Sequence, residues 1–277
     1  MMFNWMTIVH PEVAMKNFST KRTTFLTGFF GGGFAGLMGV GGGGVLVPLL
    51  TGVLKMNQHT AQGTSLVVVI FAAGTGLITY AFTGYVAWDF VGLLLCGSLI
   101  GAYLGARVVQ RFPEDALRLI FGLFLRLLAL RFLIWTSLPP LIESSGTIEI
   151  VAGIAIGFVG GFAAGVLGIG GGAIFVPALV IVLGTDQHIA QGTSLGAVLA
   201  TSAGAAFVYR RAGNSDIKSG KWIAVGAAPA GIAGALLAGF LSPEVLQRIF
   251  GSVILIVGLH RLAITSGLVA VIKDFKK

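Results

Sequence analysis

The chain has 277 residues, of which 56% are hydrophobic and only 10% are charged, and its mean hydropathy is +0.95. Soluble domains have roughly 25% charged residues, so this chain lacks the charge needed to cover its surface in water. The composition therefore excludes a soluble fold and predicts an integral membrane protein. The net charge of +8 does not indicate a nucleic-acid partner, because Lys and Arg form short clusters between apolar runs, as topology signals do.

The apolar segments are predicted to be helices, because a helix crosses the hydrocarbon core with about 20 residues. Residues 1–23 are too polar for a signal peptide and are expected to form a short arm before the first span. Each half of the chain then opens with an apolar stretch longer than one span, at 24–54 and 148–183. Ordinary spans are expected at 62–83, 90–109, 117–137, 190–209, 222–241 and 246–268.

The two halves are copies of one unit, related by an offset of 129 residues, from Gly36 to Gly165. Residues 36–44 read GLMGVGGGG, and the same pattern recurs as GVLGIGGGA. Residues 58–66 read QHTAQGTSL and recur at 187–195 with one difference in nine positions. Such a repeat indicates a duplicated structural unit.

The opening stretch of the first half is predicted to be a hairpin. As one helix it would be roughly 46 Å long, too long for an upright span, and four glycines at 41–44 interrupt it. It either crosses once with a tilt or turns at the glycines and returns. A returning stretch places fourteen of the eighteen Lys and Arg residues on the cytoplasmic side and one outside, whereas a single crossing places five outside. Because positive residues favour the cytoplasmic side, the hairpin is preferred.

A hairpin followed by three spans makes the two halves cross the membrane in opposite senses. The predicted fold is an all-α integral membrane protein with two inverted repeats, each a Gly-broken helical hairpin plus three transmembrane helices. Inverted repeats with broken helices near the midplane are typical of secondary transporters. The expected segments are a cytoplasmic arm at 1–23, a first repeat at 24–142, a second repeat at 147–272 and a cytoplasmic tail at 273–277.

The glycine runs are candidate anion sites. After each run a short helix restarts, at 45–54 and 174–183, and its first N–H groups lack helical partners at the positive end of the dipole. Such an end binds anions, and glycine lets a ligand approach the backbone. Pro48 and Pro177 are expected in about the first turn, where a missing N–H costs least. The predicted binding residues are Gly41, Gly42, Gly43, Gly44, Gly170, Gly171 and Gly172.

A different reading of these glycines stays open. Small residues at spacings of four run through both halves, as in Gly28, Gly32 and Gly36. Such spacing lets helices approach closely in membranes. The glycine runs could therefore serve packing alone.

A group of neutral polar residues follows each glycine run and adds further candidates. Hydroxyls and amides donate hydrogen bonds to an oxyanion without the desolvation cost of a buried cation. The predicted substrate-binding residues of this group are Gln62, Thr64, Ser65, Gln191, Thr193 and Ser194. His59 and His188 are candidates for substrate contact or gating. The alternative for both sets is that they cap the start of a helix.

Charged residues within spans are functional candidates because they are costly there. Arg126 and Arg131 are the deepest and could contact the substrate or gate its path, although they could also snorkel to the headgroups. No carboxylate falls in mid-membrane, and the four histidines lack metal-ligand spacing. Residues 39–44 match G-x-G-x-x-G, but no strand precedes them and no acidic residue follows at the required distance. Neither a metal nor a cofactor is expected.

The paired glycine turns, each followed by a proline and then by A-Q-G-T-S, resemble the sulfite exporter TauE/SafE family, also called the 4-toluene sulfonate uptake permease family. The resemblance covers both repeats, 24–142 and 147–272. It implies a multi-pass membrane protein that moves sulfite, sulfonates and related organosulfur anions. An anionic substrate agrees with the helix ends described above.

The leading hypothesis is a transporter of small sulfur-containing anions that works by alternating access around the two glycine turns, with sulfite export as the first choice. A passive anion channel shares the fold, and a non-transporting scaffold or assembly factor is the alternative from another class. An enzyme is least favoured, because no catalytic acid, Ser–His pair or metal cluster is evident. The expected partners are a small anion and the lipid bilayer of the cell membrane, with both termini cytoplasmic; the sequence leaves a homo-oligomer open.

Overall fold

The computed structural model describes residues 21–113, 123, 146–249, 251–252 and 255. Over these residues the chain is helical and has no strands, as the composition predicts. The helices are α1 (Lys21–Met38), α2 (Gly43–Gly52), α3 (Gln58–Phe82), α4 (Trp88–Val109), α6 (Gly146–Leu167), α7 (Gly172–Leu183), α8 (Gln187–Arg211) and α9 (Ile217–Ala238).

Four of the predicted single spans are confirmed as helices, with ends that shift by up to five residues. They are α3, α4, α8 and α9. The two long apolar stretches are each divided in two, as α1 with α2 and as α6 with α7. Most of the predicted spans at 117–137 and 246–268 lie outside the described residues.

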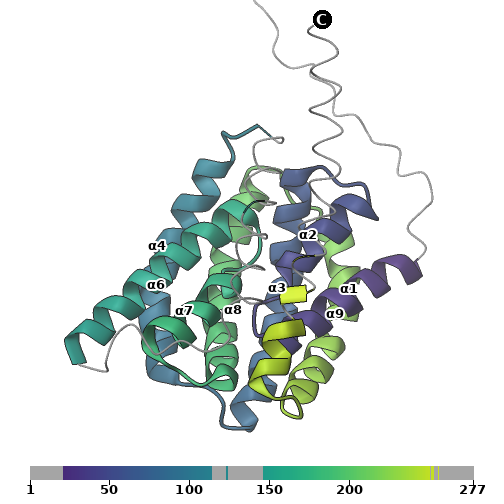
Figure 1. Ribbon diagram of the computed structural model, residues 1–277. Coiled ribbons are helices and arrows are strands. Elements are labelled where there is room, and N and C mark those ends of the chain that lie inside the picture. Colours follow the sequence, from purple (N-terminus) through teal and green to yellow (C-terminus); the bar gives the residue numbers. More distant parts are fainter. Residues whose placement is uncertain (1–20, 114–122, 124–145, 250, 253–254, 256–277) are drawn as a thin grey trace, which may run out of the picture.

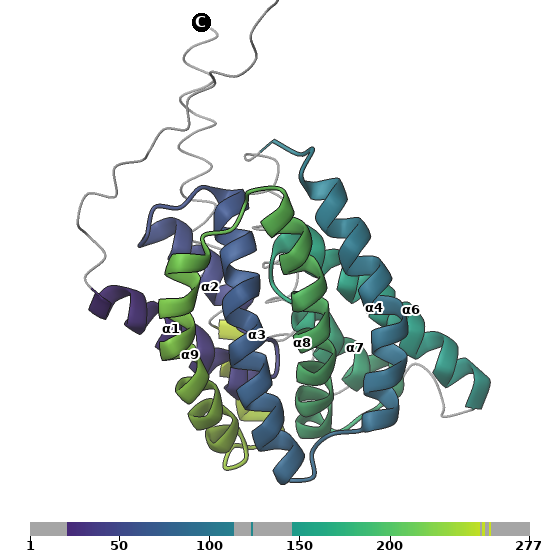
Figure 2. The same cartoon turned by 180° about the vertical axis from the view of Figure 1, so that it is seen from behind.

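Helices α3 and α8 lie side by side in the middle of the molecule, between two helix pairs (Figure 1). On one side α9 packs against α3 and α1 against α9; on the other, α4 packs against α8 and α6 against α4. Figure 2 shows the same order from behind. Each outer pair combines one helix from each half of the chain, so the two repeats interleave and do not form separate lobes.

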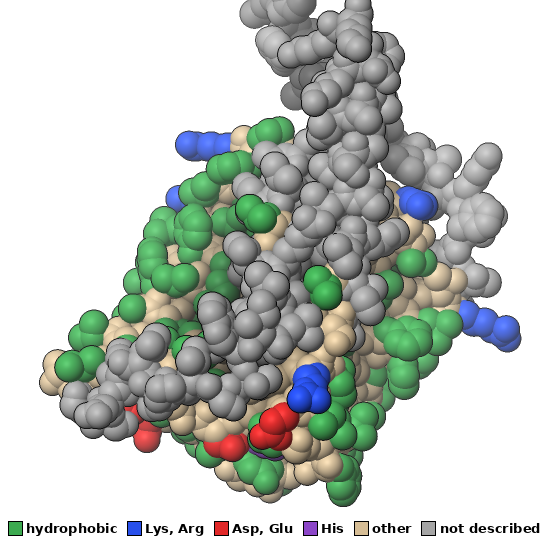
Figure 3. Space-filling view, in the orientation of Figure 1, with side chains coloured by type: hydrophobic (Ala, Val, Ile, Leu, Met, Phe, Trp, Pro, Cys, Tyr) green, Lys and Arg blue, Asp and Glu red, His purple; other side chains and the backbone are tan. Residues whose placement is uncertain are grey.

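Large hydrophobic side chains face outward from this arrangement. Phe30, Phe82 and Phe240 are 63%, 89% and 86% exposed, and hydrophobic side chains spread over much of the surface in Figure 3. Among the described helices, five are long and apolar enough to cross a membrane: α3, α4, α6, α8 and α9. Because soluble proteins rarely expose so much apolar surface, this outer surface suits contact with lipid.

Glycines at spacings of four determine how closely the outer helices approach. Gly28, Gly32 and Gly36 place α1 directly on the backbone of α9, because a Cβ on any of them would collide with a carbonyl oxygen of α9. The equivalent glycines of α6 lie against α4 in the same way: Gly157, Gly161 and Gly165. Close packing through small residues is thus confirmed for these stripes.

Helices α2 and α7 end in matching turns, and one of the positions that differ between them requires positive φ. At the end of α2 the N–H of Met56 donates to the carbonyl of Leu50, which brings Lys55 into the left-handed region with φ 55°. Gly184 has the equivalent place after α7, with φ 65°. Glycine is the usual residue in this helix-ending motif, and other residues are strained there by about 1 kcal/mol.

We therefore expect Lys55→Gly to stabilise the protein. The substitution relieves backbone strain at an exposed position, and after the added flexibility of the unfolded chain the gain should be about 0.5–1 kcal/mol. Lys55→Ala keeps the strain and serves as the control, while Gly184→Ala should lower stability by about 1 kcal/mol. Thermal unfolding in detergent measures all three; a lower unfolding midpoint for Lys55→Gly than for Lys55→Ala would contradict the prediction.

Candidate functional site

Each half breaks its first apolar segment at a glycine turn. The turn at 39–42 separates α1 from α2, and three of its glycines have φ between 68° and 78°. The turn at 168–171 separates α6 from α7, with three glycines between 69° and 92°. Glycine adopts such positive φ values at little cost. The chain reverses here, since Gly42 comes back against the backbone of Gly31, so the break and return predicted from the sequence are confirmed.

The short helices begin earlier than predicted. Helix α2 starts at Gly43, two residues before the expected start, and α7 starts two residues early in the same way. Pro48 and Pro177 are therefore the sixth residues of their helices and lie in the second turn, so the expectation of a first-turn position is wrong. The reason is that a left-handed glycine at each N-cap lets the helix begin at the next residue.

The two glycine turns touch each other inside the molecule. Gly43, the first residue of α2, lies so close to Ile169 of the other turn that a Cβ on Gly43 would collide with the Cα of Ile169. Gly172, the first residue of α7, meets Val40 in the same way. All four of these residues are buried. Helices α2 and α7 thus begin at one place, where the two halves meet.

Both of these helix ends have N–H groups without a partner in the described part of the chain. The N–H groups of Val45 and Leu46 donate to the carbonyl of Gly42, but within the described residues no acceptor is found for those of Gly43 and Gly44. Helix α7 repeats this pattern at the equivalent residues. Unpaired N–H groups at the positive end of a helix dipole favour a bound anion.

A matched pair of tyrosines connects the turns to α3 and α8. The hydroxyl of Tyr209 lies 3.1 Å from Oε1 of Gln62 and 3.0 Å from the carbonyl of Gly165. The hydroxyl of Tyr80 lies 3.0 Å from Oε1 of Gln191 and contacts a carbonyl of α1 equivalently. Each tyrosine therefore joins a candidate glutamine of the other half to a glycine-rich helix. The repeat offset relates the two tyrosines, which is the signal in the sequence that could have identified them.

The predicted glutamines and serines lie in this region, but their bonding differs between the halves. Gln62 Nε2 donates to the carbonyl of Val166 at 3.2 Å, and Ser65 Oγ donates to that of Gly168 at 2.5 Å. Their equivalents on α8 are Gln191 and Ser194. Nε2 of Gln191 and Oγ of Ser194 are buried and have no partner within the described part of the chain.

Thr64 and Thr193 have structural partners on the opposite half. The N–H of Asp216 donates to Oγ1 of Thr64 at 2.9 Å, and the N–H of Ala87 donates to Oγ1 of Thr193 at 3.0 Å. Ala87 and Asp216 are the N-cap residues of α4 and α9. The two threonines thus fix where these helices begin, and their predicted contact with substrate stays a prediction.

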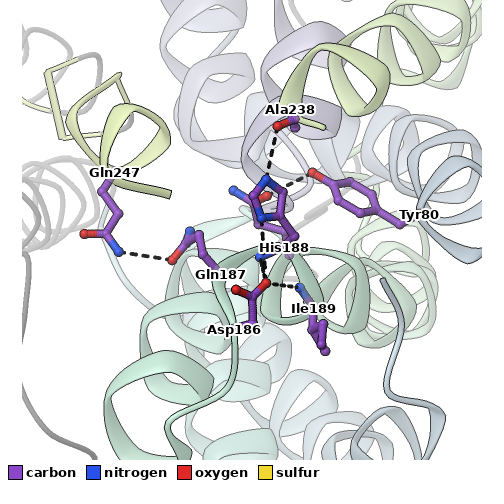
Figure 4. Close-up of polar contacts among 8 residues, drawn as sticks. Tyr80, Asp186, Gln187, His188, Ile189, Ala238 and Gln247 are labelled. Atoms are coloured by element: carbon purple, nitrogen blue, oxygen red, sulfur yellow. Dashed lines mark hydrogen bonds and ion pairs between the residues drawn. The ribbon is translucent and has the colours of Figure 1, made fainter. Parts of the chain in front are cut away.

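The two candidate histidines connect helix ends. Nε2 of His188 lies 3.2 Å from the carbonyl of Ala238, the last residue of α9, and Nδ1 lies 3.7 Å from a carboxylate oxygen of Asp186 (Figure 4). Nε2 of His59 lies 3.2 Å from the carbonyl of Phe112, shortly after α4. Both rings tie the start of a central helix to the end of an outer one.

The polar groups at the turns are neutral. Among the residues whose burial is described, no Asp, Glu, Lys or Arg is buried. The same part of the chain contains no cluster of His, Cys, Asp and Glu able to hold a metal ion. Arg126 and Arg131, predicted to contact the substrate or gate its path, lie outside the described residues. What the site offers a ligand is thus a set of amides, hydroxyls and backbone N–H groups.

Comparison with known proteins places the chain in a family. A family model described as "Sulfite exporter TauE/SafE" matches residues 1–132 and 153–271. The chain belongs to the TauE/SafE family. This membership agrees with the apolar outer surface and supports a multi-pass membrane protein.

Relatives of this TauE/SafE protein are described as probable membrane transporter proteins. One from Xylella fastidiosa (strain 9a5c) is 32% identical over 234 residues, which cover 82% of this chain and 90% of the relative. YjnA of Bacillus subtilis (strain 168) is 27% identical over 252 residues, covering 84% and 96%. YunE of the same strain is 32% identical over 194 residues, covering 61% and 70%. These descriptions point to a transporter and away from an enzyme. No solved structure matches the chain.

In this TauE/SafE protein we expect Tyr209→Phe to lower the free energy of unfolding by about 1–3 kcal/mol, because Gln62 and Gly165 lose a donor in the buried interior. Tyr103→Phe is the control, since Tyr103 is 40% exposed on α4 and should change stability by less than about 0.5 kcal/mol. Unfolding in detergent, followed by tryptophan fluorescence, gives both values. Equal effects of the two substitutions would show that the tyrosine contact does not stabilise the fold.

Proposed function

We propose that this protein transports small sulfur-containing anions, such as sulfite or organosulfonates, across the cell membrane. The observation that supports it most directly is the meeting of the two glycine turns, where the N-termini of α2 and α7 lie together with unpaired N–H groups. Membership in the TauE/SafE family supports the same substrate class. An oxyanion accepts several hydrogen bonds at once, which suits a site made of N–H groups, hydroxyls and amides.

The proposed mechanism is alternating access between two inverted repeats. Equivalent contacts on the two sides support it: Gly39 lies against Gln191, and Gly168 lies against Gln62. A hairpin plus three spans in each half would give the repeats opposite orientations in the membrane. Such a pair has two related states that open the same midplane site to opposite sides. The Lys and Arg distribution places both termini on the cytoplasmic side in this proposal.

Flux measurements in proteoliposomes test the transport function. Purified protein is reconstituted with labelled sulfite inside, and efflux is measured with and without unlabelled sulfite outside. A transporter gives saturable efflux that external substrate accelerates, whereas a channel gives flux that does not saturate. Absence of flux for sulfite and for a panel of sulfonates, above empty liposomes, would overturn the proposal.

We expect Gly171→Leu and Gly171→Ala to reduce this flux. Gly171 has φ 92°, and a Cβ there would lie 2.8 Å from the ring of Phe175 and 2.9 Å from a carbonyl oxygen. The strain alone should reduce transport by about tenfold for Gly171→Ala, and the larger side chain should abolish it. Gly204→Leu is the matched control, because a Cβ on Gly204 meets only one atom, at 3.9 Å.

Size-exclusion profiles in detergent check that each of these variants is folded before its flux is compared. Folded Gly171→Ala protein with wild-type flux would show that the second turn does not lie on the transport path.

A further inference from the structure

The central helix α8 has a polar face that α3 does not reproduce. Ser202 follows Gln191 and Ser194 along α8, at spacings that place all three on one side of the helix. In α3 the equivalents are Gln62, Ser65 and Ala73, so the repeat loses its third polar residue. Past the shared segment at 58–66 and 187–195, the two central helices keep few identical residues: Val69 matches Val198 and Tyr80 matches Tyr209, whereas Ala73 and Ser202 differ in polarity.

The donors on this face of α8 are buried and unused. Gln191, Ser194 and Ser202 all have 0% exposure. Nε2 of Gln191 and Oγ of both serines have no hydrogen-bond partner among the described residues. Buried polar groups are nearly always paired in native proteins, so three unpaired donors on one face indicate that a ligand completes the set.

The same face reaches both glycine turns. A Cβ on Gly39 of the first turn would lie 2.5 Å from Cα and Cβ of Gln191. At the second turn, Oγ of Ser202 lies 2.9 Å from the position a Cβ on Gly170 would take, immediately before the N-cap of α7. Val198, between the serines, touches both turns. This face of α8 thus lies beside the turns that lead into α2 and α7.

The α3 face is used differently. Gln62 and Ser65 both donate to carbonyls of the second half, Val166 and Gly168. Ser65 thereby uses its single donor proton, and Gln62 uses one of its two amide protons. Ala73 offers no hydroxyl. The side-chain donors of α3 therefore hold the second turn in place, whereas the three donors on α8 have no partner among the described residues.

We propose that one oxyanion binds on the α8 side, held by Gln191, Ser194 and Ser202 together with the N–H groups at the start of α7. Ser202 is the residue that makes the site unequal between the repeats. The inference rests on the proposed function, and it specifies which half of the repeat contacts the anion in this conformation. All of its donors are neutral, so the ligand is recognised by its oxygens.

Matched serine substitutions separate ligand binding from stability. Ser202→Ala and Ser194→Ala remove unpaired hydroxyls, so the unfolding midpoint without ligand should stay the same or rise. Each should raise the KM for sulfite by about tenfold or more, because a hydrogen bond to a charged group is lost. Ser65→Ala removes a paired hydroxyl and should instead lower the midpoint. Tyr103→Phe, at an exposed position of α4, is the control that should leave both the midpoint and KM nearly unchanged.

Sulfite-dependent thermal stabilisation of the detergent-solubilised protein gives a second readout that does not need transport. Wild type should be stabilised by millimolar sulfite, and Ser202→Ala should need about tenfold more sulfite for the same shift. Unchanged KM and unchanged stabilisation in Ser202→Ala and Ser194→Ala, in a wild type that does transport sulfite, would overturn the assignment to α8. Wild-type protein that neither transports nor is stabilised by any oxyanion would instead overturn the proposed function.

Discussion

The structure depends on how two breaks in the backbone are accommodated inside an apolar molecule. A helix in lipid pairs its own polar groups, but a turn leaves several without partners, and each costs several kcal/mol in hydrocarbon. Here both turns are enclosed by α3 and α8. Side chains of these helices supply donors to carbonyls near the breaks, such as Gly165 and Gly168. Among the described residues no acceptor is found for the N–H groups at the starts of α2 and α7, and that imbalance is what supports the proposed anion site.

The interleaving of the repeats limits how the molecule can move. Glycines hold α1 on α9 and α6 on α4 at backbone distance, and each pair joins the two halves of the chain. A motion of one repeat as a rigid body against the other would break both of these interfaces. In a transport cycle of the proposed kind, the bodies that move are therefore the mixed pairs with the helices attached to them, and the contact between α3 and α8 is where they can shift.

Much of this architecture follows from the sequence. Hydrophobic length predicted the spans, the offset of 129 predicted the duplication, and the glycine runs predicted the breaks. The starts of α2 and α7 were placed too late, because a helix can begin directly after a left-handed glycine and residue type alone does not show which glycine has that conformation. The partners of Thr64 and Thr193 could not be predicted either. Both hydroxyls bond to backbone more than 100 residues away, and only the tertiary packing brings those N–H groups within reach.

The two halves share the contacts that pack their helices together, and they differ in polarity at a few positions near the turns. The tyrosine–glutamine contacts and the glycine turns recur in both halves because the packing of two equivalent units requires them. At one position of the central helices the halves differ in polarity: Ala73 in α3 corresponds to Ser202 in α8, whose hydroxyl lies beside Gly170. A single anion cannot accept hydrogen bonds equally from both helix ends when all of the side-chain donors around it come from α8. In our proposal, the unequal face of α8 therefore holds the anion closer to the second turn than to the first.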